Sequence, residues 1–256
     1  GEIVRELRAG LPSVRHLIVL HHQNATNLIA DCADFTRTCG RNDAETASFE
    51  PLWLPFDHPL WIVYSSGTTG LPKPIVHSHG GMIVVAMVTG LHMDIGGSYG
   101  ANNFGERFHW YSSTGWVMWN CQVAGLLSGT TCVIFDGSPG GPRDAPDWST
   151  LWRFAARHGV TFLGSGAAFF AGCAKAGVDL ARCGDLSRIR ALGTTGSPLS
   201  AEVQRWGTEQ VRRMRRLAGE TPATAGLSTP AQAGAEPQPD VWWFNISGGT
   251  DFAGGF

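Results

Sequence analysis

The sequence predicts an α/β fold built on a mostly parallel sheet that is flanked by helices. Short apolar segments bounded by turn residues alternate with amphipathic segments, and this alternation is typical of β-α-β units. One predicted helix, Ser149–His158, leads directly through Gly159 into the apolar strand Val160–Gly164. Apolar residues make up 43% of the 256 residues and charged residues 16%, which suits a folded protein with a substantial core.

Each predicted strand is short, apolar and bounded by turns. These segments are Arg15–Leu20, Leu60–Ser65, Thr131–Phe135, Val160–Gly164, Arg188–Gly193 and Val241–Ser247. Two helices have clear end signals: Ser149 caps the first and Gly159 ends it, whereas Ser200 caps the second, Ser200–Leu217. The apolar run Met82–Val88 predicts a buried helix. It is too short to span a membrane, which needs about 20 apolar residues.

Composition shifts predict the domain organisation. We expect a partial N-terminal region at residues 1–50 and a core at residues 51–256, interrupted at 219–240 by a flexible insertion rich in Ala, Pro, Gly and Thr. The segment Asp31–Phe49 is polar and poorly periodic, so a long surface loop or a mobile insert is expected there. The chain does not begin with methionine and stops at Phe256 inside a glycine-rich motif, which predicts a piece of a longer protein.

Charge and cysteine usage narrow the class of partner. The formal net charge of −2 gives no electrostatic reason to expect nucleic acid or an anionic membrane surface. The six cysteines form no CxxC pair, which favours reduced thiols over a disulfide framework or a zinc site. No basic and then apolar leader begins the sequence. We therefore predict a cytoplasmic protein that acts on small molecules; the sequence leaves its oligomeric state open.

The most informative segment is Tyr64-Ser-Ser-Gly-Thr-Thr-Gly-Leu-Pro-Lys73. Gly67 and Gly70 permit a tight turn that brings backbone N–H groups toward an anion, and Lys73 adds a positive charge. The hydroxyl groups that can donate to phosphate oxygens are those of Ser65, Ser66, Thr68 and Thr69. The spacing does not match a Walker A loop. Because the segment follows an apolar strand, we expect it at the end of a sheet strand, where α/β proteins bind ligands; an ordinary turn is the alternative.

This segment, extended to Ile75, resembles the phosphate-binding signature of the adenylate-forming acyl-CoA synthetases, which include luciferases and peptide-synthetase adenylation domains. Further similarities follow in family order at Phe108–Val117, Gly125–Thr131, Gly193–Leu199 and Ile246–Asp251. The pairing of YSSGTTGLPKPIVHSHGG with ISGGTD is most similar to the acetoacetate-activating members. The resemblance implies part of the large N-terminal domain of such an enzyme.

The family's reaction joins a carboxylic acid to ATP, giving an acyl-adenylate and pyrophosphate, and then transfers the acyl group to coenzyme A. The resemblance therefore implies ATP, Mg²⁺, coenzyme A and acetoacetate as ligands. It implies that Lys73 and Thr250 are catalytic, with Thr250 bonding the α-phosphate, and that Asp251 helps to hold Mg²⁺. The residues implied to bind the nucleotide are Ser65, Ser66, Gly67, Thr68, Thr69, Gly70, Lys73, Gly196, Ser197, Pro198 and Thr250.

The resemblance also implies an acyl pocket. Its walls match Trp116, Val117, Met118, Thr195 and Gly248. Acetate-specific relatives carry a tryptophan at the position of Gly248, so glycine leaves room for a longer acid. The Thr195 hydroxyl is a candidate hydrogen-bond partner for a 3-oxo group. His77 and His79 have the spacing of a metal-binding pair, but no third ligand lies nearby, so no metal role is predicted.

Several elements of the family are absent from the 256 residues. They are a ribose-binding aspartate, a hinge, and a small C-terminal domain with a catalytic lysine, so the 256 residues alone are expected to adenylate poorly. Two alternatives remain: a synthetase for another short- or medium-chain acid, and a non-catalytic truncated module that binds a nucleotide.

Overall fold

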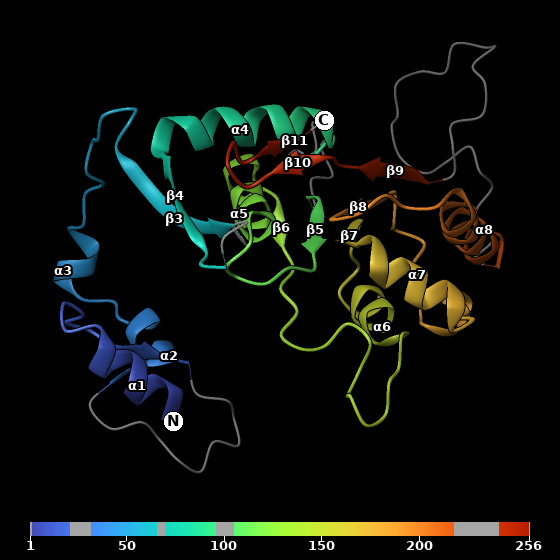
Figure 1. Ribbon diagram of the computed structural model, residues 1–256, viewed down its shortest axis with the longest axis horizontal. Coiled ribbons are helices and arrows are strands. Elements are labelled where there is room, and N and C mark those ends of the chain that lie inside the picture. The colour runs from blue at the N-terminus through green and yellow to red at the C-terminus, as the bar shows by residue number, and fades with distance from the viewer. Residues whose placement is uncertain (1, 21–31, 66–69, 96–104, 218–240, 256) are drawn as a thin grey trace. The chain divides into compact units, whose positions relative to one another are not determined.

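The computed structural model describes residues 2–20, 32–65, 70–95, 105–217 and 241–255 (Figure 1). The chain forms two compact units, Gly1–Leu54 and Pro55–Phe256. The predicted insertion at 219–240 lies outside the described residues. Within those ranges, no helix combines the length and the apolar character needed to cross a membrane.

The first unit is a small assembly of short elements. Its elements are α1 (Glu2–Gly10), β1 (Ile18–Val19), β2 (Ala33–Asp34), α2 (Phe35–Cys39) and α3 (Ala44–Ala47), and β1 pairs with β2 in parallel. The prediction of one long loop over residues 31–49 is therefore wrong. Aspartate caps explain the helices: the Asp34 carboxylate accepts a hydrogen bond from the Arg37 backbone N–H, and Asp43 forms a capping box with Thr46.

The second unit is built on a five-stranded sheet in the order β6-β5-β7-β8-β9, in which all neighbouring pairs are parallel. The strands are β5 (Arg107–Trp110), β6 (Thr131–Cys132), β7 (Phe162–Gly166), β8 (Ala191–Thr195) and β9 (Trp242–Asn245). The predicted α/β class is confirmed. The sequence missed β5 and placed the start of β7 two residues and that of β8 three residues too early.

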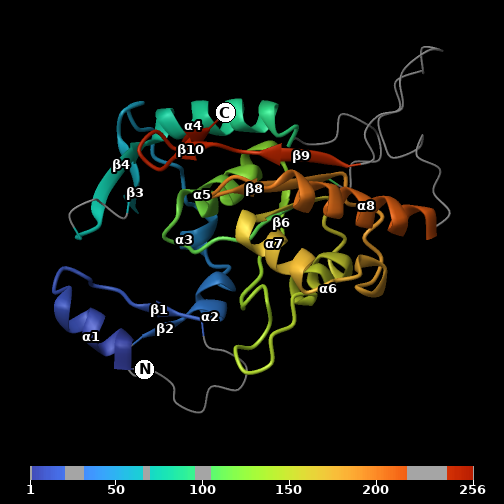
Figure 2. The same ribbon diagram turned by 45° about the vertical axis from the view of Figure 1, so that its right-hand side comes forward.

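Helices cover both faces of this sheet. On one face lie α6 (Thr150–Arg157), α7 (Ala167–Lys175), the 3₁₀ turn η2 (Leu180–Arg182) and α8 (Ala201–Leu217), which bury Leu163 and Leu192 (Figure 2). The other face buries the alternate residues Phe162 and Ala191 beside α5 (Val117–Ala124), which runs into the 3₁₀ turn η1 (Gly125–Ser128). This alternation follows from the two-residue period of a strand.

Trp110 packs directly on the backbone of two neighbouring strands. A Cβ atom at Gly164 would lie 2.1 Å from the Trp110 ring, and one at Gly193 would lie 2.5 Å from it. No side chain fits at either position without moving the ring. The two glycines therefore let a fully buried indole fill the second face of the sheet.

The predicted phosphate segment lies on a separate element. Strand β3 (Pro59–Ser65) pairs antiparallel with β4 (Lys73–Ser78), and α4 (His79–His92) follows at once. The segment was expected at the end of a sheet strand. It does follow the strand β3, but β3 belongs to an antiparallel pair and not to the five-stranded parallel sheet. The predicted burial of the helix is only partly right: Met82 is buried, whereas Met87 and Val88 are exposed.

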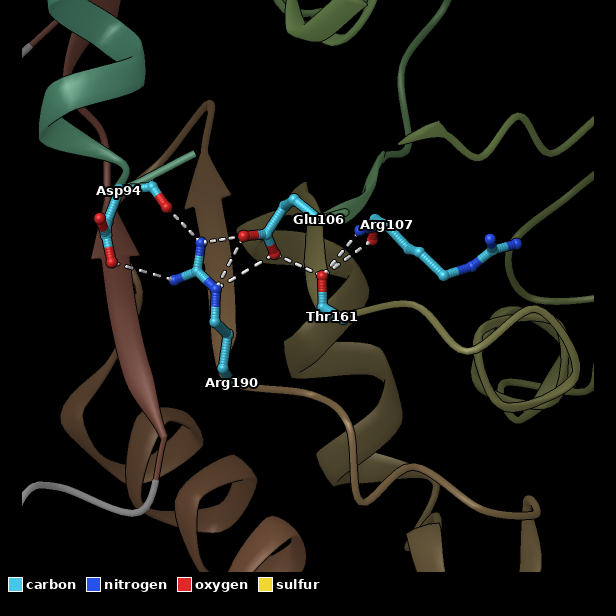
Figure 3. Close-up of polar contacts among 5 residues, drawn as sticks. All are labelled: Asp94, Glu106, Arg107, Thr161 and Arg190. Atoms are coloured by element: carbon cyan, nitrogen blue, oxygen red, sulfur yellow. Dashed lines mark hydrogen bonds and ion pairs between the residues drawn. The ribbon is translucent and has the colours of Figure 1, made fainter. Parts of the chain in front are cut away.

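A polar network fastens the amino edge of the parallel sheet (Figure 3). The Arg190 guanidinium donates from Nε to both Glu106 oxygens at 3.1 and 2.9 Å, and from Nη2 to Oε2 at 2.6 Å. Glu106 also accepts from the Thr161 hydroxyl, and the Asp94 carbonyl accepts from Arg190. Each of these residues lies next to a different element: Glu106 precedes β5, Thr161 precedes β7, Arg190 precedes β8 and Asp94 follows α4. The Glu106 carboxylate and the Arg190 guanidinium therefore join four elements.

His109 is a buried histidine on β5, facing α6. Its Nδ1 donates to the Val133 carbonyl at 2.7 Å, and its ring lies 5.5 Å from that of Phe154. Its Nε2 has no hydrogen-bond partner among the described residues. Burial lowers the pKa of His109 from 6.5 to about 4, against the smaller effect of the Val133 hydrogen bond. The imidazole is therefore neutral at pH 7.

We expect His109 to lower the free energy of unfolding as the pH falls from 6.5 to 4. In the unfolded chain this imidazole takes a proton below about 6.5, whereas the folded form stays neutral until about 4, so acid favours unfolding in this window. The difference in pKa corresponds to about 3 kcal/mol, fully lost below pH 4. His109→Gln keeps a donor for Val133 but does not titrate. Urea unfolding across this pH range should show a shallower slope for the variant; parallel slopes would contradict the prediction.

Candidate active site

The candidate site lies at the carboxyl edge of the parallel sheet, where α/β proteins usually bind ligands. Strand β8 ends at Thr195 and β9 ends at Asn245. After β9 the chain forms the small antiparallel pair β10 (Gly248–Gly249) and β11 (Gly254–Gly255). The amino end of α5, at Val117, reaches the same place.

These segments surround a cavity of about 50 Å³. The predicted pocket residues that line it are Trp116, Val117, Met118, Thr195 and Gly248, together with Thr250. The structure thus brings all five predicted pocket residues and one predicted phosphate-binding residue to one cavity. The sequence did not single out the other lining residues, which are Thr89, Cys121, Ile246, Gly249 and Ala253.

Thr195 has a hydrogen bond that bears on its predicted role. It is largely buried, and its hydroxyl donates to the Ile246 carbonyl at 2.9 Å. A hydroxyl has one proton to donate, and a ketone oxygen can only accept. Thr195 can therefore recognise a 3-oxo group only if its bond to Ile246 breaks, and as it stands the bond holds the β8 end against the segment that leads to Gly248.

The hairpin brings together two residues that flank the phosphate segment. Ser65, the last residue of β3, and Lys73, the first residue of β4, are register partners, and Lys73 is exposed to solvent. Gly70 has a φ of +93°, a conformation that favours glycine. The remaining predicted residues, which are Ser66, Gly67, Thr68 and Thr69, lie outside the described residues.

His77 links this hairpin to the cavity. Its Nε2 lies 2.8 Å from the Thr250 carbonyl, and because a carbonyl only accepts, Nε2 carries the proton. Lys73 comes four residues before His77 on β4, so the two side chains face the same side of the strand. The distance between these two positions along the strand is about 13 Å. The sequence predicted no role for His77, because its partner is 173 residues away. The hydrogen bond instead makes His77 a candidate positioning residue for Thr250.

The predicted nucleotide turn is exposed directly after a buried strand. All five residues of β8 are buried, whereas Gly196, Ser197 and Pro198 are exposed. Gly196 has a φ of +87°, which explains the glycine at the start of the turn. The turn thus offers backbone and side-chain groups to a ligand at the carboxyl edge.

Asp251 is the predicted metal ligand, and it lies exposed one residue beyond Thr250. The described ranges contain no group of three or more His, Cys, Asp or Glu residues placed to hold a metal ion. Mg²⁺ does not need such a group, since it commonly binds one or two carboxylates together with substrate phosphates and water. A single carboxylate next to Thr250, the residue predicted to bind the α-phosphate, would therefore suit an ion delivered with ATP.

Comparison with known proteins identifies the family. The profile of the AMP-binding enzymes matches residues 4–241, which is most of the chain. The chain belongs to this family. Acetoacetyl-coenzyme A synthetase of Rhizobium meliloti is 35% identical over 203 residues, covering 79% of this chain and 26% of that protein. Acetoacetyl-CoA synthetase of Gallus gallus is 33% identical over 201 residues, covering 75% of this chain and 28% of that protein.

The fold of the family is shared as well. The structure of acetoacetyl-CoA synthetase from Streptomyces lividans is 41% identical and superposes with a TM-score of 0.76, covering all of this chain and 34% of that one. The chain thus spans about a quarter to a third of the length of these relatives. The similarity confirms the predicted α/β architecture of the family.

Proposed function

We propose that this chain forms part of an enzyme that activates acetoacetate with ATP and transfers the acyl group to coenzyme A. The observation that carries the proposal is that the predicted acyl-pocket residues and Thr250 line the same cavity at the carboxyl edge of the sheet. An acid whose tail occupies this cavity would present its carboxylate to an α-phosphate bound at Thr250. This is the arrangement that adenylation requires.

Gly248 and the relatives support acetoacetate as the acid. Gly248 lines the cavity without a side chain, so this wall leaves room for a tail longer than the methyl group of acetate. Two curated relatives and one solved structure carry the name acetoacetyl-CoA synthetase. Shape and similarity therefore favour the same four-carbon acid.

The charged and hydroxyl-bearing residues would handle the phosphates of ATP. Lys73 and the hydroxyls of the phosphate segment would neutralise and orient the β- and γ-phosphates, and Thr250 would donate to the α-phosphate as the carboxylate attacks. His77 would hold the Thr250 backbone in place. Asp251 would bind Mg²⁺, whose charge would stabilise the departing pyrophosphate.

Pyrophosphate release by the full-length product of the gene tests the proposal. We expect release with ATP and acetoacetate to exceed that with acetate, propionate or butyrate. Preference for another of these acids would favour the alternative synthetase, and a preference for acetate would refute the pocket argument. Release with none of them would favour the non-catalytic module. Sequencing the gene past Phe256 for a ribose-binding aspartate, hinge and lysine-bearing domain gives an independent check.

Thr195→Val tests how the acid is recognised. Because the Thr195 hydroxyl donates to Ile246, we expect kcat/KM for acetoacetate and for butyrate to fall by the same factor of about ten, through a loosened β8–β9 segment. A selective loss with acetoacetate would instead assign the ketone contact to Thr195. Thr195→Ser is the matched control, since it keeps the hydroxyl and should retain near-normal activity with both acids.

A further inference from the structure

A second cavity lies beside the first. It has a volume of about 20 Å³ and is almost wholly apolar in its lining, between α4, α5, the 3₁₀ turn η1 and Phe108 of β5. The α4 residues that face it are Met82, Val85, Ala86, Thr89 and Gly90, at the three- and four-residue spacing of one helix face. The site described above makes no use of this space.

Thr89 and Cys121 are the residues that line both cavities. Thr89 comes from α4 and Cys121 from α5, so the two helices each contribute one small side chain to the partition. Cys121 lies one helical turn after Val117 and Met118, which face the first cavity, and shortly before Ala124 and Gly125, which face the second. Whatever tail enters the first cavity therefore meets this pair where the second cavity begins.

The two side chains differ in what they offer. The Thr89 hydroxyl has no hydrogen-bond partner among the described residues, so its proton is available, unlike that of Thr195. Burial raises the pKa of the Cys121 thiol to about 11, so this side chain is neutral at pH 7 and behaves as a small apolar wall. One residue can thus recognise a polar atom, and the other limits length.

We propose that Thr89 and Cys121 determine the acid specificity of the site. Thr89 donates a hydrogen bond to the 3-oxo oxygen of a four-carbon acid, and Cys121 stops longer chains from entering the apolar cavity behind it. This inference rests on the proposed function, because it takes the cavity of about 50 Å³ as the acyl site. It adds residues that no sequence motif of the chain singled out.

Binding of free acids tests the partition without depending on turnover. Dissociation constants of butyrate, hexanoate and octanoate are measured by isothermal titration on the full-length gene product. We expect affinity in the wild type to stop rising beyond four carbons. In Cys121→Ala it should rise by about fourfold per added methylene from four to six carbons, as each enters the apolar cavity. Cys183→Ala, a buried thiol in the core on the other face of the sheet, is the matched control.

Thr89→Val tests the hydrogen bond, because valine keeps the shape and removes the hydroxyl. We expect the affinity for acetoacetate to fall about tenfold, with butyrate unchanged. Equal losses for both acids would overturn the role of Thr89. A chain-length profile of Cys121→Ala like that of the wild type, in a variant with an unchanged thermal unfolding curve, would overturn the role of Cys121.

The outcomes also separate this inference from the proposed function. Acids that bind with the expected profiles but support no pyrophosphate release would leave the partition standing and count against the enzyme. Normal turnover of acetoacetate, with binding profiles that the Thr89 and Cys121 substitutions leave unaltered, would support the enzyme and overturn the partition. Failure of the wild type to bind any of the four acids would overturn the partition as an acid-specificity device.

Discussion

Arg190→Met is expected to lower the free energy of unfolding by about 3–5 kcal/mol, because it leaves the Glu106 carboxylate without its cation. The Glu106 side chain is only 9% exposed, and Arg190 gives it three hydrogen bonds. After the substitution, its remaining side-chain donor among the described residues is the Thr161 hydroxyl. Methionine keeps the length of the aliphatic stem, so the loss comes from charge and hydrogen bonds. Urea unfolding at pH 7 measures it.

Two further variants make this prediction specific. Adding Glu106→Gln to Arg190→Met should recover part of the lost stability, because the buried charge disappears together with its partner. Arg153→Met is the control: its pair with Asp147 is also close, but the side chains are 49% and 43% exposed, so a loss below about 1 kcal/mol is expected. Similar losses for Arg153→Met and Arg190→Met would show that burial does not determine the strength of the network.

Gly248→Trp should have the largest effect on function. An indole at this position fills the cavity of about 50 Å³ that we assign to the acyl tail, so kcat/KM for acetoacetate should fall by at least about 100-fold. Acetate, whose tail is a single methyl group, should lose much less. The expected result is therefore a reversal of preference, measured as pyrophosphate release by the full-length gene product with each acid.

The controls for Gly248→Trp separate the pocket from the fold. Gly248→Ala adds one methyl group and should reduce acetoacetate activity only slightly. The KM for ATP should stay within a few-fold of the wild type in both variants, because every predicted nucleotide-binding residue except Thr250 lies on another segment. Unchanged acetoacetate activity in Gly248→Trp would refute the pocket argument, whereas a parallel loss of ATP binding would indicate a disturbed fold.

Local sequence signals predicted much of the fold because they act over a few residues. The apolar runs of β7, β8 and β9 and the end signals of α6 and α8 identified these elements, although the strands begin later than predicted and the Ser149 side chain makes no capping hydrogen bond. The first unit was predicted poorly, since its helices depend on single aspartate caps in a polar stretch. Strand β5 was missed because Arg107 and His109 interrupt the apolar pattern; both side chains find specific partners in the folded chain.

The sequence by itself determined the family resemblance and the residue types of the site, because both are encoded in short, contiguous motifs. Tertiary structure decided which of these residues meet. It placed the two ends of the phosphate segment on paired antiparallel strands and joined His77 to Thr250 across 173 positions. It also directed the Thr195 hydroxyl to the Ile246 carbonyl. It also placed Thr89 and Cys121 between two cavities. Contacts between distant segments depend on how whole elements pack, and no local pattern of residues encodes them.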